Sequence, residues 1–260
     1  MIPILTKRQK IIITAAILTI GLLSTQLVDF NLRFKFIAGL SVASLLLSLW
    51  ALWEGLNLTK SVILLILPVF FTAAVASFYF LLPVRWLTRL PVASLFGLTF
   101  YLLLLAQNVF NVASIRTIPL YRAASTASFL FTLLSAFFFF NVIYAFNLLF
   151  VWNGIVVFLV TYPLVLQMLW TIEMEDRITS AALIQSLVLS LCLTEAAMSF
   201  SFWPMPTTIW SLALSSTMYV VMGLATQFLH GRGSRRVVWE YSLIGLTVLA
   251  LSFFATSWTG

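Results

Sequence analysis

Charged residues are scarce in this chain. Only 8% of its 260 residues are Asp, Glu, Lys or Arg, whereas soluble domains carry about a quarter. With 62% hydrophobic residues, the chain has too little polar surface to face water. The composition therefore excludes an ordinary soluble domain. Because no hydrophilic stretch is long enough to fold separately, we expect a single transmembrane domain over residues 1–260.

Histidine and cysteine are almost absent. The chain has one of each, His230 and Cys192, which nearly excludes His/Cys metal clusters and the nucleophilic triads that use these residues. An intrachain disulfide is impossible with one cysteine. The common metalloprotease, nucleophile-elbow and phosphate-loop motifs are absent as well. The sequence therefore gives no reason to expect a catalytic residue or a cofactor.

Long apolar runs are what the chain has instead. Each has roughly the 17 to 25 residues with which an α-helix crosses the hydrocarbon core, and none alternates as a barrel strand would. We predict an all-α, polytopic transmembrane helix bundle of nine spans. Eight spans remain the alternative, because the segment SFSFWPMPTT (199–208) suits a re-entrant loop. The predicted spans are 11–28, 34–53, 61–82, 90–110, 124–146, 149–171, 178–200, 207–229 and 238–257.

Tryptophan and basic residues support this topology. The nine tryptophans avoid the centres of the runs, as expected for indole rings at the headgroup boundary. With the N-terminus in the cytoplasm, ten Lys and Arg fall inside and four outside, in agreement with the positive-inside bias. The four outer cations are Arg33, Lys35, Arg85 and Arg89.

The net charge of +7 comes from thin clusters at the predicted membrane edges, the densest being HGRGSRR (230–236). Anionic lipid headgroups at the cytoplasmic face are therefore the expected partners. A nucleic acid is not expected, because its binding would need a continuous basic face. A membrane-protein partner or a second copy of the chain is left open.

Glu195 is the charge that this topology does not explain. It lies in an apolar run with no Lys, Arg or His within fifteen residues on either side. A carboxylate at a helix centre costs about 2.5–3.5 kcal/mol by insertion scales, so it needs a partner, a proton or water. Arg85 and Arg89 lie on the same predicted outer side. We favour a fixed salt bridge over a transport or proton site.

Amides form a second polar group, AQNVFN (106–111), near the inner end of the fourth run. Gln107 and Asn108 each lie about one helical turn from Asn111, and the three amides can bond across helices or line a water-filled vestibule. Ser44 and Ser48 share a face of the second run, which predicts close helix packing. Pro68 interrupts the third run, and we expect a packing role for it.

A third group lies in the predicted cytoplasmic loops. Glu173, Glu175 and Asp176 are candidates for holding a divalent cation, with Arg116 and Arg122 across the same surface. Metal and arginine together would suit an enzyme of lipid-linked phosphates. Short wet loops between membrane helices are commonly charged, however, so we favour an ordinary solvated loop.

Two stretches, YLLLLAQNVFNVASIRTIPLYRAASTASFLFTLLSAFFFFN (101–141) and TEAAMSFSFWPMP (194–206), resemble an uncharacterised family of polytopic membrane proteins from reduced-genome bacteria. This resemblance implies a bacterial inner-membrane location. It implies no activity and assigns no functional residue.

Three functions remain. We prefer a transporter or permease-like bundle, which should enclose a polar cavity reaching near the middle of the membrane. The alternative is a noncatalytic subunit or scaffold of a membrane assembly, which should be packed solid and show an exposed, non-lipid interface. A membrane-embedded enzyme acting on lipid-linked phosphates is the second alternative.

Overall fold

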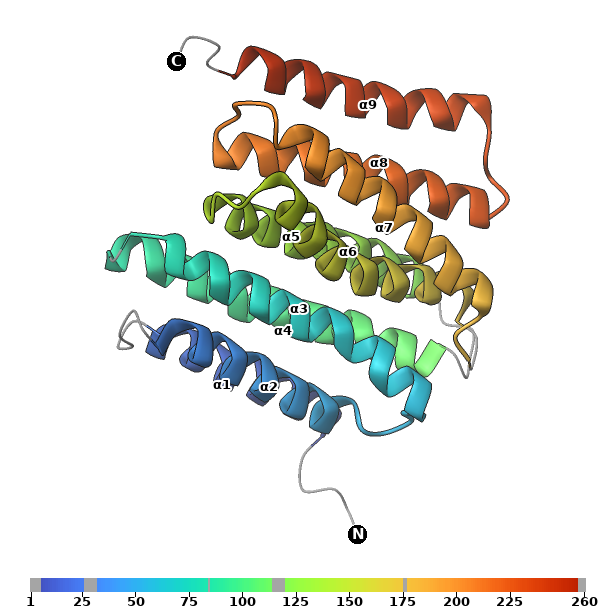
Figure 1. The fold of residues 1–260 in the computed structure, drawn as a ribbon. Coiled ribbons are helices and arrows are strands. Elements are labelled where there is room, and N and C mark those ends of the chain that lie inside the picture. Colours follow the sequence, from blue (N-terminus) through green and yellow to red (C-terminus); the bar gives the residue numbers. More distant parts are fainter. Residues whose placement is uncertain (1–5, 26–31, 84, 114–119, 175–176, 257–260) are drawn as a thin grey trace. The chain divides into compact units, whose positions relative to one another are not determined.

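A computed structural model describes residues 6–25, 32–83, 85–113, 120–174 and 177–256. Over these residues the chain is all-α, as predicted (Figure 1). The nine helices there follow the nine predicted runs, with boundaries that differ by a few residues. They are α1 Lys7–Ser24, α2 Arg33–Leu52, α3 Leu58–Leu81, α4 Trp86–Ala113, α5 Tyr121–Ala145, α6 Phe150–Glu173, α7 Ser180–Phe200, α8 Thr207–Leu229 and α9 Arg235–Phe254.

Side-chain caps begin several helices. Thr6 and Gln9 form a capping box at the start of α1. Thr179 accepts a hydrogen bond from the Ala182 amide at the start of α7, and Ser234 accepts one from Val237 at the start of α9. Each cap satisfies a backbone N–H that has no partner within the helix. The polar residues between the apolar runs therefore set where these helices start.

Eight of the described helices, α2 to α9, have the length and hydropathy of a membrane span. The first helix falls short because Lys7, Arg8 and Lys10 lie within its 18 residues. The count of eight candidate spans agrees with the eight-span alternative, although that alternative placed the missing crossing at SFSFWPMPTT rather than at α1. Within SFSFWPMPTT, α7 ends at Phe200 and α8 begins at Thr207, and both qualify as spans.

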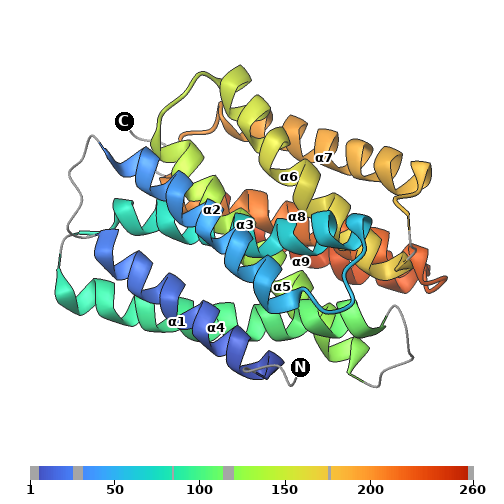
Figure 2. The ribbon, with the colours of Figure 1, turned by 90° about the horizontal axis from the view of Figure 1, so that it is seen from below.

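The helices group into two compact units. The N-terminal unit comprises residues up to Thr132 together with Met174–Arg177, and the C-terminal unit comprises Leu133–Glu173 with Ile178–Gly260. In the N-terminal unit, α1 packs along α4 and α2, and α2 packs along α3 (Figure 2). In the C-terminal unit, α6 packs along α7, α7 along α8, and α8 along α9. A single domain over 1–260 stays a prediction.

Glycine allows close helix contacts within each unit. A Cβ atom on Gly97 of α4 would lie 2.5 Å from Oγ1 of Thr19 on α1. On α8, a Cβ atom on Gly223 would collide with the ring of Tyr241 from α9. Lipid tails provide no hydrophobic drive for helix association, so such close packing holds membrane helices together.

The tryptophans follow two patterns. Trp53, Trp152 and Trp239 are exposed near helix ends, as an interfacial belt predicts. Trp170 and Trp210 also lie near helix ends, but both are buried. Trp210 stacks on Tyr144, with ring centroids 4.6 Å apart. Position near a helix end thus did not fix their exposure, because neighbouring aromatic rings provide an alternative apolar surface.

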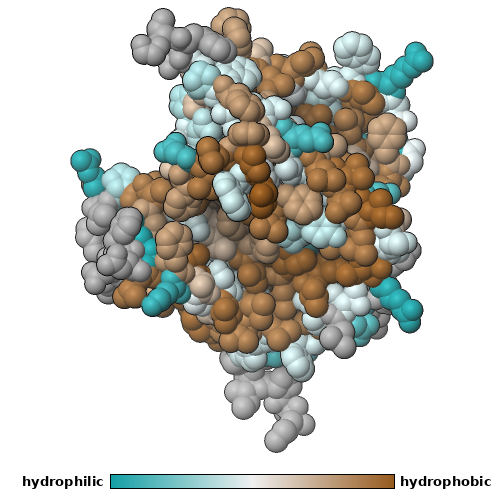
Figure 3. All heavy atoms as spheres, in the orientation of Figure 1, coloured by the Kyte–Doolittle hydropathy of each residue, from teal (hydrophilic) through white to brown (hydrophobic). Residues whose placement is uncertain are grey.

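Hydrophobic side chains cover most of the surface seen in Figure 3, and strongly hydrophilic residues lie mostly toward its left and right margins. At least one exposed leucine, isoleucine or phenylalanine occurs on each of the described helices. An exterior of this kind is solvated by lipid tails rather than water. Together with the eight candidate spans, it identifies a multi-pass membrane protein.

A candidate polar site in the N-terminal unit

Asn111 fixes the level at which α2 and α4 end. Its Nδ2 atom donates to the carbonyl oxygens of Leu52 at 3.0 Å and of Glu54 at 2.9 Å. The last carbonyls of a helix have no partner within it, so this amide satisfies two groups where α2 ends. Because the C-terminal ends of α2 and α4 meet here, the two helices run in the same direction.

Lysines from α1 and α3 surround the same end of the unit. Lys10 Nζ lies 3.1 Å from Glu54 Oε1, and Lys7 Nζ donates to the Glu54 carbonyl at 3.4 Å. Both cations face the C-terminal end of α2, where the helix dipole favours positive charge. Burial lowers the pKa of Lys7, an effect that Glu54 opposes and Lys10 increases. Lys60, near the start of α3, is buried.

Gln107 lies one helical turn before Asn111 on α4, and Ser48 lies one turn before Leu52 on α2. The two residues are therefore at about the same depth. Both side chains are fully buried. Neither the Nε2 nor the Oε1 atom of Gln107 has a hydrogen-bond partner among the described residues, and the same holds for Oγ of Ser48. Leaving such a group unbonded costs about 1–3 kcal/mol. Buried polar groups of this kind commonly bind an ordered water.

Helix α3 contributes further polar groups at about the same depth. Ser44 on α2 donates to the Pro68 carbonyl at 3.2 Å, and Thr72 donates to Ser44 at 3.0 Å. This contact sets the register of α2 against α3, which run in opposite directions. Pro68 has no N–H, so the carbonyl of Leu64 loses its helical partner. One turn from Pro68 toward the lysines, Leu64 lies level with Ser48 and Gln107.

We call Ser44, Ser48, Pro68, Thr72 and Gln107 the polar layer. These residues place hydroxyl, amide and carbonyl groups of three helices at neighbouring depths in the N-terminal unit, where all five residues are buried. Its own side chains carry no formal charge. The arrangement suits neutral molecules that both donate and accept hydrogen bonds, with water as the smallest.

The other predicted amide, Asn108, lies outside the layer. It is half-buried, and its Oδ1 atom has no partner among the described residues. The predicted amide group thus divides, with Gln107 entering the layer and Asn111 bonding the end of α2. Ser48 and Pro68 were predicted only to pack. The signal that could have placed them in a site is the four-residue spacing of Ser44 and Ser48 combined with the missing N–H of Pro68.

The two predicted outer arginines have different surroundings. Arg85 is exposed, just before α4. Arg89 was expected in the loop, but it lies within α4 and is 4% exposed. Its Nη2 atom donates to the Leu82 carbonyl at 3.3 Å, and its guanidinium carbon lies 5.2 Å from the Tyr79 ring centroid. Arg89 therefore stabilises the end of α3. A pairing of either arginine with Glu195 stays a prediction.

Glu195 lies on α7, about one and a half turns before the helix ends, and its side chain is exposed. Among the described residues of the C-terminal unit, none forms an ion pair with it. The basic residues of this unit, Arg232, Arg235 and Arg236, lie in or beside the turn between α8 and α9. Since α8 begins where α7 ends, that turn is at the opposite end of α7.

The predicted acidic cluster is only partly described. Thr179 Oγ1 donates to Glu173 Oε2 at 3.0 Å, which links the end of α6 to the start of α7. Arg122 is exposed in the first turn of α5. Glu175, Asp176 and Arg116 lie outside the described residues, and within the described ones no three His, Cys, Asp or Glu side chains gather as a metal site would require. A metal there stays a prediction.

Comparison with known proteins places the chain in a family. Residues 36–255 match a family described as "Protein of unknown function (DUF5656)". The chain belongs to DUF5656. The match includes the polar layer and Glu195, whereas α1 with Lys7 and Lys10 precedes it. No curated protein and no solved structure matches the chain. The resemblance to a family without a known activity is thereby confirmed in part, and the bacterial source that it implied stays a prediction.

Proposed function

We propose that this DUF5656 protein is a permease-like bundle that passes a small, uncharged, hydrogen-bonding solute through the N-terminal unit. The observation that supports the proposal is the fully buried amide of Gln107, neither of whose polar atoms has a hydrogen-bond partner among the described residues. An amide kept in that state loses stability. A bound water or solute would restore its hydrogen bonds.

The chemistry of the layer sets the class of solute. Amide, hydroxyl and carbonyl groups can replace the hydration of a neutral solute, but they offer no countercharge to an anion. The side chains of the layer include no carboxylate that would balance a cation. We therefore propose water, urea and glycerol as representatives of the transported class.

The location follows from the same charges. Lys7, Lys10 and Lys60 lie at the end of the N-terminal unit that the loop charges predict to be cytoplasmic. With the N-terminus inside, these lysines would meet anionic headgroups of the inner leaflet. We propose a bacterial inner membrane as the location.

Solute flux into proteoliposomes tests the proposal. The full chain is reconstituted into vesicles, and swelling is followed by stopped-flow light scattering under gradients of urea or glycerol and under an osmotic step for water. We expect at least one of the three to enter faster than into protein-free vesicles. Gln107→Leu should reduce that flux about tenfold, because the solute would lose its bonds to the amide.

Gln185→Leu is the matched control, since Gln185 is an amide of the C-terminal unit and lies outside the layer. Its flux should equal that of the wild type. If none of the three solutes crosses faster than through protein-free vesicles, or if both variants lose flux equally, the proposal is wrong.

A noncatalytic subunit of a membrane assembly is the second candidate function. The exposed carboxylate of Glu195 on a helix of bilayer length favours it, because a lipid-facing charge calls for a partner.

A further inference from the structure

The outward face of α7 is a continuous stripe. Exposed side chains recur every three or four residues and thus share one side of the helix. With one exception, the stripe is formed of apolar or small side chains; that exception is Glu195. Its members are Ile184, Val188, Leu191, Cys192, Glu195 and Ser199.

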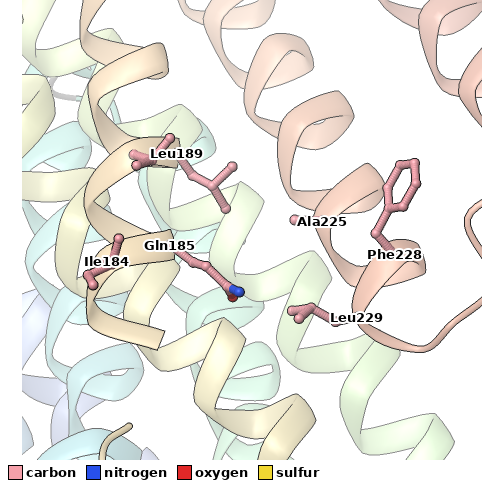
Figure 4. A pocket seen from close by; sticks show the side chains of 7 residues that line it. Ile184, Gln185, Leu189, Ala225, Phe228 and Leu229 are labelled. Atoms are coloured by element: carbon pink, nitrogen blue, oxygen red, sulfur yellow. The ribbon is translucent and has the colours of Figure 1, made fainter. Parts of the chain in front are cut away.

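A groove continues this stripe toward the start of α7. It lies between α7 and α8, has a volume of about 360 Å³, and includes Ile184 and Val188 of the stripe in its wall. Figure 4 shows Gln185 extending from α7 into the groove, with Ala225 and Leu229 on α8 facing it. Side chains of a helix laid along the stripe would enter this groove.

Glu195 cannot easily reach water from this position. It lies about 7 Å from the end of α7, given the rise of about 1.5 Å per residue. Side chains of a helix tilt toward its N-terminus, so the carboxylate points away from the nearer membrane boundary. A charge in this place needs a cation or a hydrogen-bond donor at the same depth.

The cations of the C-terminal unit do not meet this need, because they lie at the other end of α7. In the N-terminal unit, Arg89 already bonds the end of α3. A cation from a loop would cover Glu195 alone and leave the apolar remainder of the stripe exposed. A helix would cover both.

We propose that the stripe of α7 docks a transmembrane helix of another protein, and that this helix carries a lysine or arginine at the depth of Glu195. The apolar positions supply close packing along the stripe, and the ion pair fixes the register of the two helices. The proposal holds whether or not the protein conducts a solute.

Cys192 provides a built-in reporter, since it is the single cysteine of the chain, is exposed and lies one turn from Glu195 on the stripe. The full chain is reconstituted into phosphatidylcholine vesicles with a synthetic leucine-rich transmembrane peptide. The peptide carries one lysine at matched depth and one cysteine a turn away. A matched peptide has leucine in place of the lysine. Disulfide formation under mild oxidation is measured by mass on a gel.

We expect the lysine peptide to cross-link about three- to tenfold more than the leucine peptide, the range that interhelical polar contacts in membranes provide. Glu195→Gln keeps the shape of the side chain and should abolish the preference. Glu195→Lys should transfer it to a peptide that carries glutamate.

Three results would overturn the proposal. Equal cross-linking of the two peptides to the wild type would show that charge does not select the partner. A preference that persists in Glu195→Gln would place the selecting group elsewhere. Predominant Cys192–Cys192 dimers of the wild type would show that a second copy covers the stripe. Gel filtration of Glu195→Gln in detergent checks that the variant is folded.

Discussion

Gln107 and Glu195 are polar residues at comparable depths in two helices, yet they have opposite surroundings. Each lies roughly one and a half turns before the end of its helix, α4 or α7. Gln107 is fully buried inside the N-terminal unit, whereas Glu195 is exposed on the C-terminal unit. The neutral amide can be enclosed at a cost of a few kcal/mol, but a carboxylate costs more and needs a partner. The difference favours a solute for the first and a partner helix for the second.

The largest expected effect comes from placing a carboxylate inside. Gln107→Glu should lower the free energy of unfolding by about 3–5 kcal/mol, because the layer's own side chains offer no countercharge to a buried carboxylate. The reverse change on the outside, Glu195→Gln, should alter it by less than about 0.5 kcal/mol in the isolated protein. SDS titration in mixed micelles measures both. Similar losses in the two variants would contradict the assignment of inside and outside.

The next comparison is between a glycine on a packed helix face and a glycine on an open one. Gly223→Leu should cost about 1–3 kcal/mol, since the new side chain would collide with Tyr241 and push α9 away from α8. Gly39→Leu, on a face of α2 with open space around the glycine, should be neutral or slightly stabilising. Thermal unfolding followed by tryptophan fluorescence distinguishes them, and equal midpoints would show that the α8–α9 contact is not close.

Asn111 and Asn108 are neighbouring amides with different roles. Asn111 bonds the end of α2, whereas Asn108 does not. Asn111→Ala should cost about 1–2 kcal/mol, because it leaves the carbonyls of Leu52 and Glu54 without this donor. Asn108→Ala should cost less than half as much. Chemical unfolding of the two variants in the same detergent is the check, and a larger loss for Asn108→Ala would reverse the roles given to them.

The smallest expected effect is that of the Lys10–Glu54 pair. Lys10→Gln should change stability by less than about 1 kcal/mol, since the side chain of Glu54 is 56% exposed and water screens the pair. Unfolding at low and high salt measures this, and the wild type should lose its advantage at 1 M salt. An advantage unaffected by salt would mean that the pair is shielded from solvent.

The positions of the helices could be predicted from the sequence, because hydrophobic runs of bilayer length have few alternatives. Whether a residue faces the interior or the exterior of the protein could not be predicted. Gln107 and Asn108 are neighbours in one motif, and only the packing of the helices buries the first fully and leaves the second half-buried.

The surroundings of Arg89 could not be predicted from the sequence either. Its charge suggested a loop between two runs, but α4 begins at Trp86, and the guanidinium is buried against Tyr79 and the Leu82 carbonyl. The sequence shows a cation near a membrane edge. It does not show that a neighbouring helix end needs that cation.

Water access to the Gln107 side chain in lipid bilayers tests the polar layer most directly. Solid-state NMR with transfer of magnetisation from water to side-chain amides, on the full chain labelled at glutamine, resolves this group from the others once Gln107→Leu has assigned it. We expect a strong transfer from water to the Gln107 amide despite its complete burial. Absence of transfer, with a signal retained for Gln185 at the open groove, would show that the polar layer is dry and binds neither water nor a solute.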